Sequence, residues 1–174
     1  KKIDDKTKAV VQMTLTTYDD SLCRKIEPGV CVTSRRVSVL KEMHAAGIPT
    51  VVWLSPILPH INDTRENIEG IVDVCAEAGV KGVICYGMGL TLREGNREYF
   101  YDCLDRLFPG LKEQYISEYG LRYEVMSLKH GELMRLFHEK CGEYGIMHNN
   151  DEIFRYMYTF EDKEEAEQMT LWDL

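Results

Sequence analysis

Residues 50–86 read TVVWLSPILPHINDTRENIEGIVDVCAEAGVKGVICY, and this stretch decides the fold. It begins with a continuous apolar run, Thr50–Leu54, and ends with another, Lys81–Tyr86, of the kind found in strands buried on both faces. Between the two runs lies an apolar stripe with the spacing of one helix face. Strand, helix and strand in this order predict two parallel strands joined by a right-handed crossover. The stripe consists of Ile68, Ile71, Val72, Cys75 and Ala76.

Short signals bound this helix and the helix before it. Asp63 with Glu66 three residues later is typical of a capping box and predicts the start of the helix. Gly79 predicts its end. The preceding helix is expected to begin at Ser34 and to stop at Gly47, which takes the position just after a helix that glycine favours.

The alternation of strand and helix continues on both sides. Val10–Tyr18 is rich in β-branched residues and is followed by two aspartates, so it predicts a first strand. After a loop at 87–95, a third helical stripe follows, and Pro109 ends it. The stripe consists of Phe100, Cys103, Leu104, Leu107 and Phe108.

Beyond Pro109 the pattern is helical. A short helix is expected at Lys112–Tyr119 and an aromatic-rich one at Glu152–Phe160. Between them lies an amphipathic helix with Leu133, Leu136, Phe137 and Cys141 on one face. We therefore divide the chain into βα units at 1–109, a helical extension at 110–160 and an acidic, flexible tail at 161–174.

The fold class that follows is α/β, with three parallel βα units. Three parallel strands are too few to close a barrel, and they leave exposed edges. Either strands upstream are missing or a partner chain covers the edges. We favour missing strands because the chain begins with Lys1. We then expect self-association through the first strand, since its natural neighbour is absent.

Composition excludes several classes of protein. No run approaches the roughly 20 apolar residues that cross a bilayer, so we expect a cytoplasmic protein without a membrane partner. The six cysteines form no CxxC and fit small buried side chains better than a disulfide framework. The net charge is −8; residues 161–174 carry six acids and one Lys, a net of −5, which leaves −3 for the rest. This balance argues against broad, sequence-independent nucleic-acid binding.

Candidate ligand contacts follow the strands, because parallel β/α folds bind ligands outside the carboxyl ends of their strands. The first strand ends with hydroxyls that could bond a ribose or a carboxylate, and glycines after the third strand let backbone approach a flat ligand. Arg93 could form two parallel bonds to a carboxylate. The alternative is that the threonines only favour a strand and the glycines only turn the chain. The candidates are Thr14, Thr16, Thr17, Ser55, Pro56, Gly87, Gly89 and Arg93.

Three segments carry a resemblance to a known family. They are VVQMTLTTYDDSLCRKIEPG at 10–29 with Arg36 nine residues after Glu27, AGIPTVVWLSPILPHIND at 46–63, and GMGLTLREGNREYF at 87–100. Together they resemble bacterial radical S-adenosylmethionine (radical SAM) proteins. The similarity is greatest to the branch related to spore photoproduct lyase, the DNA repair photolyase-like proteins, and it covers essentially the whole chain.

The resemblance implies the C-terminal half of a partial (β/α)6 TIM-like barrel, followed by a helical C-terminal extension. Such enzymes bind a 4Fe-4S cluster through CxxxCxxC and cleave S-adenosylmethionine reductively to a 5′-deoxyadenosyl radical. This chain has no CxxxCxxC, and Cys23 and Cys31 are eight positions apart. We therefore expect an inactive fragment with no metal ligands of its own, whose full-length protein is an enzyme that acts on nucleic acid or another substrate.

The family pattern also assigns roles to single residues. It implies that Thr14 meets the cofactor ribose, with Thr16 beside it, and that Ser55 flanks the adenine or methionine. Arg93 is the candidate for a carboxylate or substrate contact. Cys85 and Tyr86 are alternative hydrogen-atom donors, although a buried cysteine is usually a core residue.

Other candidates have a structural alternative. The pattern pairs Arg36 with Glu27, and a purely structural ion pair is at least as well supported as a cofactor contact. We interpret Asn62-Asp63 as a helix cap. His138 and Cys141 could share a helix face as metal ligands, but two ligands do not make a site.

The last residues, Glu167–Trp172, resemble the peptide by which bacterial repair and replication proteins bind the sliding clamp. Leu171 and Trp172 could fill an apolar pocket while Gln168 bonds backbone. The alternative is that Leu171 and Trp172 pack back onto the C-terminal helices. A non-catalytic binding module recruited through this motif is thus the second hypothesis for function.

Overall fold

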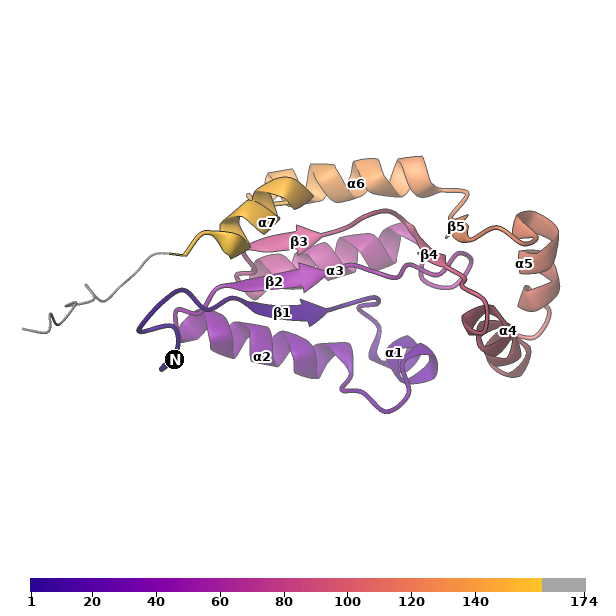
Figure 1. Ribbon diagram of the computed structural model, residues 1–174, viewed down its shortest axis with the longest axis horizontal. Helices are drawn as coiled ribbons and strands as arrows, with labels where there is room; N and C mark the ends of the chain where they lie inside the picture. Colours follow the sequence, from indigo (N-terminus) through magenta and orange to yellow (C-terminus); the bar gives the residue numbers. More distant parts are fainter. Residues whose placement is uncertain (161–174) are drawn as a thin grey trace, which may run out of the picture.

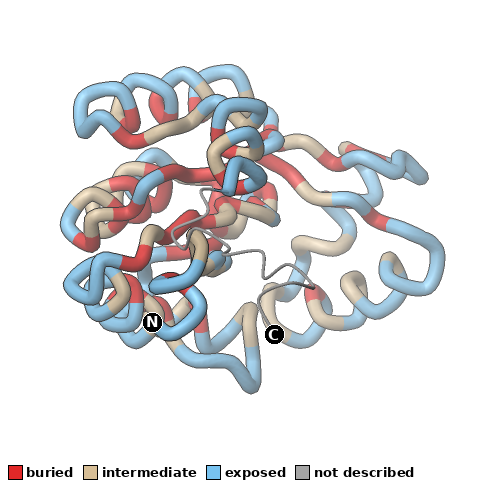
Figure 2. Tube along the Cα trace, turned by 60° about the vertical axis from the view of Figure 1, so that its left-hand side comes forward, coloured by how far each residue is buried: buried red, intermediate tan, exposed pale blue. Residues whose placement is uncertain are grey.

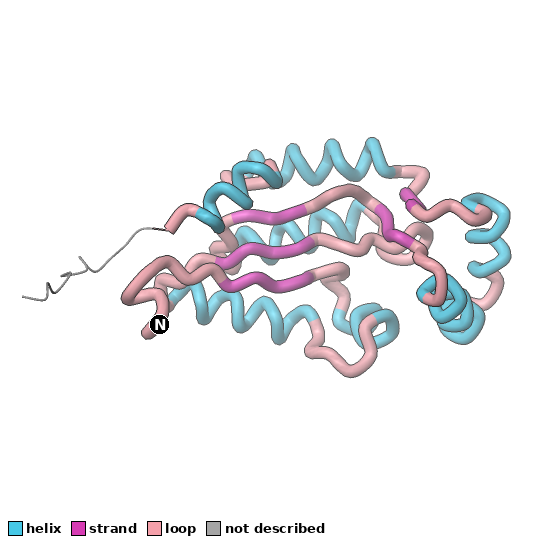
Figure 3. The backbone as a smooth tube through the Cα atoms, viewed as in Figure 1, coloured by secondary structure: helices cyan, strands magenta, loops and turns pink. Residues whose placement is uncertain are grey.

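The computed structural model describes residues 1–160 and places a three-stranded parallel sheet at the centre. The strands β1 (Val11–Thr14), β2 (Thr50–Trp53) and β3 (Gly82–Ile84) lie in the order β1-β2-β3 (Figure 1). Val11 pairs with Thr50, and Val51 pairs with Gly82. The α/β class is confirmed. Each strand is shorter than its apolar run because the run continues into the loop that follows (Figure 3).

Three helices cover one face of this sheet. They are α2 (Thr33–Ala45), α3 (Arg65–Glu77) and α6 (His130–Glu143). The predicted stripe of α3 lies in the main core, with Ala76 partly buried, and so does the predicted apolar face of α6. The strands contribute Val52 and Val83 to the same core, and the residues directly after the three strands contribute Leu15, Leu54 and Cys85. Figure 2 shows buried residues concentrated along the strands and on the inner sides of the helices.

The opposite face is only partly covered. Helix α7 (Asn150–Tyr158) packs Ile153 and Met157 against Val51 and Ile84. Just before α7, Met147 pairs in parallel with Gly82, so this segment covers the outer edge of β3. Within residues 1–160, no strand pairs with the outer edge of β1.

A second lobe, residues 89–126, lies beyond the carboxyl ends of the strands (Figure 1). It contains β4 (Gly89–Thr91), α4 (Asn96–Leu107), α5 (Leu111–Tyr119) and β5 (Glu124–Met126). β4 and β5 pair antiparallel, and the lobe has its own core around Leu92, Leu104, Tyr115, Tyr119 and Val125. We call it the β4–β5 lobe.

This lobe corrects two expectations. The segment 87–95 was expected to be a loop and the segment after 109 to be helical, but each contains a strand. The two strands pair across the predicted boundary at 109. Three-residue strands are too short to show a periodicity, and their pairing joins residues more than 30 positions apart.

Local signals placed most of the other elements within a few residues, but helix α1 (Asp20–Ile26) was not predicted. It follows an N-cap at Asp19, whose carboxylate accepts from the backbone N–H of Ser21 at 2.7 Å. Gly47 and Gly79 follow α2 and α3 with φ of 74° and 66°.

The capping box predicted at Asp63 is wrong. Thr64 is the N-cap of α3, and its side chain accepts from the backbone N–H of Asn67. The Asp63 carboxylate instead accepts a hydrogen bond from the Ser127 hydroxyl, which lies 64 positions further on. Among residues 1–160, no helix is both long and apolar enough to cross a membrane.

Candidate functional site

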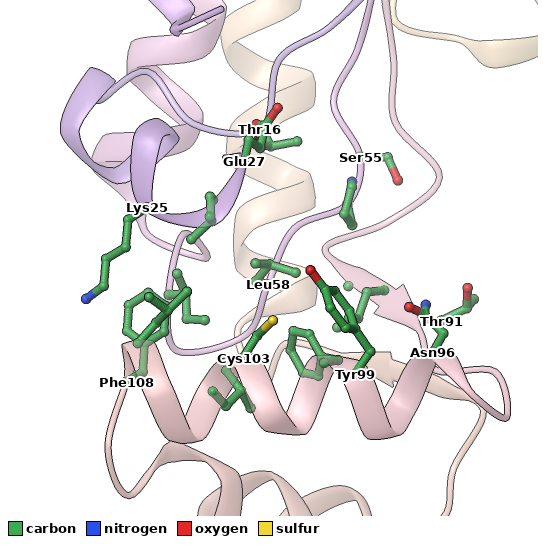
Figure 4. A pocket seen from close by; sticks show the side chains of 18 of the residues that line it. Thr16, Lys25, Glu27, Ser55, Leu58, Thr91, Asn96, Tyr99, Cys103 and Phe108 are labelled. Carbon is green, nitrogen blue, oxygen red and sulfur yellow. Dashed lines mark hydrogen bonds between the residues drawn. The ribbon is translucent and has the colours of Figure 1, made fainter. Parts of the chain in front are cut away.

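A cavity of about 740 Å³ lies between the carboxyl ends of the sheet strands and helix α4 (Figure 4). This volume is in the range of small-molecule binding sites, and the position is where parallel β/α folds bind ligands. Its walls come from the ends of the sheet strands, from the end of α1 and from the β4–β5 lobe. Its lining includes Thr14, Thr16, Lys25, Glu27, Ser55, Leu58, Tyr86, Gly87, Gly89, Thr91, Asn96, Tyr99, Phe100, Cys103, Arg106, Phe108 and Glu124.

The strand side of the cavity brings predicted residues together. Thr14 and Thr16 come from the end of β1, and Ser55 comes from the end of β2, 39 positions after Thr16. Gly87 and Gly89 follow β3 and complete this side. Gly89 could not be replaced without disturbance, because a Cβ there would lie 2.4 Å from the carbonyl oxygen of Val125. The side chains of Thr14, Thr16 and Ser55 and the backbone at Gly87 and Gly89 therefore line the same cavity.

An ion pair holds the loop after β1. Arg36 on α2 donates to the Glu27 carboxylate at 2.6 Å, and the Thr16 hydroxyl donates to the other oxygen of that carboxylate. The same guanidinium donates to the carbonyl oxygens of Thr14 at 2.9 Å and Cys31 at 2.7 Å. The expected Glu27–Arg36 ion pair is confirmed. Arg36 is not among the residues lining the cavity, so its contacts fix the positions of Thr14 and Thr16 from behind.

Two asparagines secure the same strand end. The side-chain amides of Asn62 and Asn67 donate to the carbonyl oxygen of Thr16 at 2.8 and 2.9 Å. Both residues are buried. The sequence offered only the Ile-Asn-Asp loop and a helix start as signals for them, and neither signal identifies a partner 46 or more positions away.

The α4 side of the cavity was not predicted. The sequence predicted the apolar stripe of α4 but not what it faces, and of its members only Leu104 is fully buried. All five stripe residues line the cavity, and Tyr99, which is 65% exposed, extends this wall (Figure 4). Phe100 is held edge-on against Tyr115, whose hydroxyl donates to the carbonyl oxygen of Pro59 at 2.7 Å. The sequence did show this apolar helix face, but its periodicity does not tell whether the face packs in a core or lines a cavity.

Comparisons with known proteins give relatives without an assigned activity. Over 109 residues, or 63% of the chain, the sequence is 31% identical to the uncharacterized protein Rv2578c of Mycobacterium tuberculosis H37Rv. The same identity and coverage hold for the uncharacterized protein Mb2609c of Mycobacterium bovis. The matched part is 32% of each relative, so the chain spans about a third of the length of the curated relatives it matches. No family model and no solved structure matches the chain.

Arg93 does not line the cavity. It lies between β4 and α4, and its Nε donates to the Tyr123 hydroxyl at 3.1 Å. The structure therefore does not bring it to the threonine and serine hydroxyls, which corrects the expected grouping. Its contact is to a strand-end residue of the same lobe, because β4 and β5 pair there.

Cys85 and Tyr86 face different surroundings. Cys85 lies in the main core with its Sγ 3.8 Å from the Met134 Sδ, and burial raises the pKa of its thiol to about 11. Tyr86 is 66% exposed and lines the cavity. Of the two alternatives, only Tyr86 reaches the site.

No metal site is present among residues 1–160, where no group of three or more His, Cys, Asp and Glu side chains could hold an ion. Cys141 is buried in the main core with Cys75, and burial raises the pKa of its thiol to about 12. The His138 ring lies 5.2 Å from that of His148, and burial together with His148 lowers the pKa of His138. The predicted clamp-motif residues, Gln168, Leu171 and Trp172, lie outside the described residues.

Proposed function

We propose that this chain is the C-terminal part of a radical SAM enzyme related to the spore photoproduct lyase branch. The observation that carries the proposal is the convergence of Thr14, Thr16 and Ser55 on one cavity at the carboxyl edge of a parallel sheet. The family pattern assigns cofactor contacts to these residues. A cavity of about 740 Å³ has room for such a cofactor and part of a substrate.

The proposed barrel half is supported by the outer edge of β1 and by the uncovered part of the sheet. Arg36 covers one carbonyl oxygen at that edge, that of Thr14. On the face opposite the main core, Gln12 and Tyr86 remain exposed to solvent. In a (β/α)6 barrel, additional strands paired with β1 would cover its outer edge and would also enclose the exposed face of the sheet.

The residues present suit S-adenosylmethionine but not the cluster. Thr14 and Ser55 can bond ribose hydroxyls, and the glycines after β3 can admit a flat ring. Thr16 already donates to Glu27, so it would serve a ligand as an acceptor. A 4Fe-4S cluster needs closely spaced thiolates, whereas Cys23 is buried in α1 and Cys31 is exposed in the loop between α1 and α2. The cluster would therefore be held by residues outside this chain. The cluster and S-adenosylmethionine together would supply radical chemistry.

The first test uses the full-length gene product, purified without oxygen and reconstituted with iron and sulfide. After reduction and addition of S-adenosylmethionine, formation of 5′-deoxyadenosine would support the proposal. Cluster assembly without cleavage would move the test to candidate substrates, beginning with damaged or modified nucleic acid. A protein that assembles no cluster would overturn the proposal.

Two variants test the assigned contacts in that protein. Thr14→Val and Ser55→Ala each remove one hydroxyl, and each should weaken binding of S-adenosylmethionine about fivefold to tenfold, the effect of one hydrogen bond. Ser38→Ala is the matched control, because its hydroxyl bonds the carbonyl oxygen of Ser34 on the exposed side of α2. Equal affinities in all three variants would contradict the assignment.

Recruitment to a sliding clamp is a second proposal, and the motif Gln168-Met169-Thr170-Leu171-Trp172 supports it. Deletion of residues 168–174 should abolish binding to the clamp of the same organism and leave cleavage of S-adenosylmethionine unchanged. Loss of cleavage on deletion would instead make these residues part of the catalytic domain. Unchanged clamp binding would reject the motif.

A further inference from the structure

The cavity wall formed by α4 has one aromatic surface and one cationic end. Tyr99 and Phe100 in the first turns of α4 and Phe108 directly after its last turn all line the cavity. Lys25 and Arg106 line the cavity near Phe108, and the Lys25 ammonium lies 3.9 Å from the Phe108 ring centroid (Figure 4).

We infer that this side of the cavity binds a substrate with a planar aromatic group and an anionic substituent, the ring on the α4 wall and the anion between Lys25 and Arg106. The inference deepens the proposed function, since it names the substrate class for the same cavity. A nucleotide phosphate and an aromatic carboxylate share this chemistry.

The rigidity of the wall supports binding of a ring. Phe100 packs edge-on against Tyr115 with 5.3 Å between the centroids, and Tyr115 packs against Tyr119 at the same distance. A ring fixed from behind loses little conformational entropy when a ligand stacks on it. Across the cavity, Tyr86 presents a second aromatic side chain from the end of β3.

The distribution of charge sets the orientation of the ligand. Glu27, the carboxylate on the α1 side, is paired with Arg36 at 2.6 Å. Within residues 1–160, neither Lys25 nor Arg106 takes part in an ion pair, while Glu124 lines the cavity with β5. Figure 4 places Lys25 and Phe108 at one end of α4 and Asn96 with Thr91 at the other. An anion is therefore favoured at the Phe108 end.

Cys103 provides a reporter inside the cavity. It lines the α4 wall and is partly buried, whereas Cys31 is exposed and lies outside the cavity. Cys75, Cys85 and Cys141 are buried, and burial raises their thiol pKa values, so they should not react at pH 8. The alkylation rate of Cys103 relative to Cys31 thus measures occupancy with an internal standard.

The experiment treats the 174-residue chain with iodoacetamide at pH 8 and follows both cysteines by peptide mass spectrometry. The probes are uridine 5′-monophosphate, uridine, 3-phenylpropanoate and inorganic phosphate. We expect at least one aromatic anion to slow Cys103 alone. Uridine and phosphate should each need at least a fivefold higher concentration for equal protection, because each lacks one of the two recognised groups. The more protective aromatic anion identifies the source of the anionic group.

Variants separate charge recognition from general occupancy. The double variant Lys25→Gln with Arg106→Gln should weaken protection by the aromatic anion about fivefold or more. Protection is compared as a ratio with and without probe in each variant, because Arg106 lies 3.5 Å from the Cys103 Sγ and affects its intrinsic rate. Lys41→Gln is the control, since Lys41 pairs with Glu77 on the helical face.

Three results would overturn the inference. In the first, uridine protects Cys103 as well as its monophosphate does and 3-phenylpropanoate does not protect. In the second, no probe protects Cys103 at millimolar concentration. In the third, the double variant binds the aromatic anion with unchanged affinity. The assay contains no S-adenosylmethionine, cluster or reductant. Failure of cofactor cleavage therefore leaves this binding result intact, and failure of binding leaves the cleavage result intact.

Discussion

The Glu27 carboxylate and the Arg36 guanidinium lie 2.6 Å apart and connect three segments that are separate in the sequence. Glu27 also accepts from Thr16 after β1, and Arg36 also donates to carbonyl oxygens of Thr14 and Cys31. Both side chains are largely shielded, with exposures of 22% and 11%. The pair therefore positions the strand end that forms one side of the cavity.

Removal of this charge pair should destabilise the chain. Glu27→Gln leaves the shielded Arg36 without a counter-charge, and we expect the free energy of unfolding to fall by about 2 kcal/mol, as for a hydrogen bond to a charged group. Arg36→Lys should have a similar effect, because an ammonium cannot reproduce the forked contacts.

Urea unfolding measures both variants. Arg35→Ala is the control, since this neighbour on α2 is exposed and its change should stay within about 0.5 kcal/mol. Stability of Glu27→Gln equal to that of the control would show that the pair contributes nothing.

Gly89 is required for the close approach of β4 to β5. A Cβ at this position would lie 2.4 Å from the Val125 carbonyl oxygen and 2.6 Å from the Met126 Sδ. Because the carbonyl belongs to the backbone, Gly89→Ala should cost about 2 kcal/mol of unfolding free energy. It should also speed alkylation of Cys103, since the lobe that carries this cysteine is loosened.

Gly142 provides the contrast in thermal or urea unfolding. It lies in α6, and no neighbouring heavy atom comes within 4 Å of the position that a Cβ would take, so Gly142→Ala should raise stability by about 0.5 kcal/mol. A loss at Gly142 as large as that at Gly89 would mean that backbone contact between β4 and β5 is not the cause.

Glu118 should contribute to the loss of stability as the pH falls into the acid range. The hydrogen bond from Gln114, followed by the contact with His60 at 2.8 Å, lowers the pKa of its carboxyl below the ordinary 4.5. As the pH falls, the unfolded chain binds the proton first, so stabilisation is present above pH 4.5 and is lost as the pH falls through the folded-state value.

Glu118→Gln should therefore flatten the acid limb of the stability curve, measured by urea unfolding between about pH 5 and pH 3. Glu113→Gln on the same helix is the matched control, because Glu113 is exposed and forms no ion pair within the described residues. An acid limb as steep in Glu118→Gln as in the parent would argue against this role.

The outer edge of β1 should support self-association. The N–H groups of Val11 and Leu15 donate to the carbonyl oxygens of Pro49 and Trp53, on the side of β2. The N–H groups of Gln12 and Thr14 therefore point to the open edge. An unpaired edge pairs readily with another strand. Light scattering at increasing concentration should show dimers.

Gln12→Pro should reduce this association, since it removes one of the edge N–H groups. Gln12→Ala is the control: it loses the same side-chain hydrogen bond from the Trp53 indole but keeps the backbone donor. A strict monomer, or equal dimerisation of the two variants, would contradict the edge model.

Much of the helical and strand content follows from the sequence, because periodicity is repeated within each segment. The stripe of α3 and the apolar face of α6 identified core residues correctly. The placement of Thr14, Thr16 and Ser55 at one edge also follows, because the carboxyl ends of parallel strands meet on the same side of a sheet. Glycines at 47 and 79 marked helix ends because their positive φ angles suit glycine.

Only the tertiary structure decided what each pattern faces. The apolar face of α4 lines a cavity as well as packing on the core of its own lobe, Asp63 bonds Ser127 instead of capping α3, and Arg93 contacts Tyr123 instead of the strand-end hydroxyls. The β4–β5 pair could not be predicted from the sequence either, since each strand has only three residues and shows no periodicity. The physical reason is the same in each case: a local pattern reports which side of an element is apolar or polar, but its partner depends on chain segments brought together from 30 or more positions away.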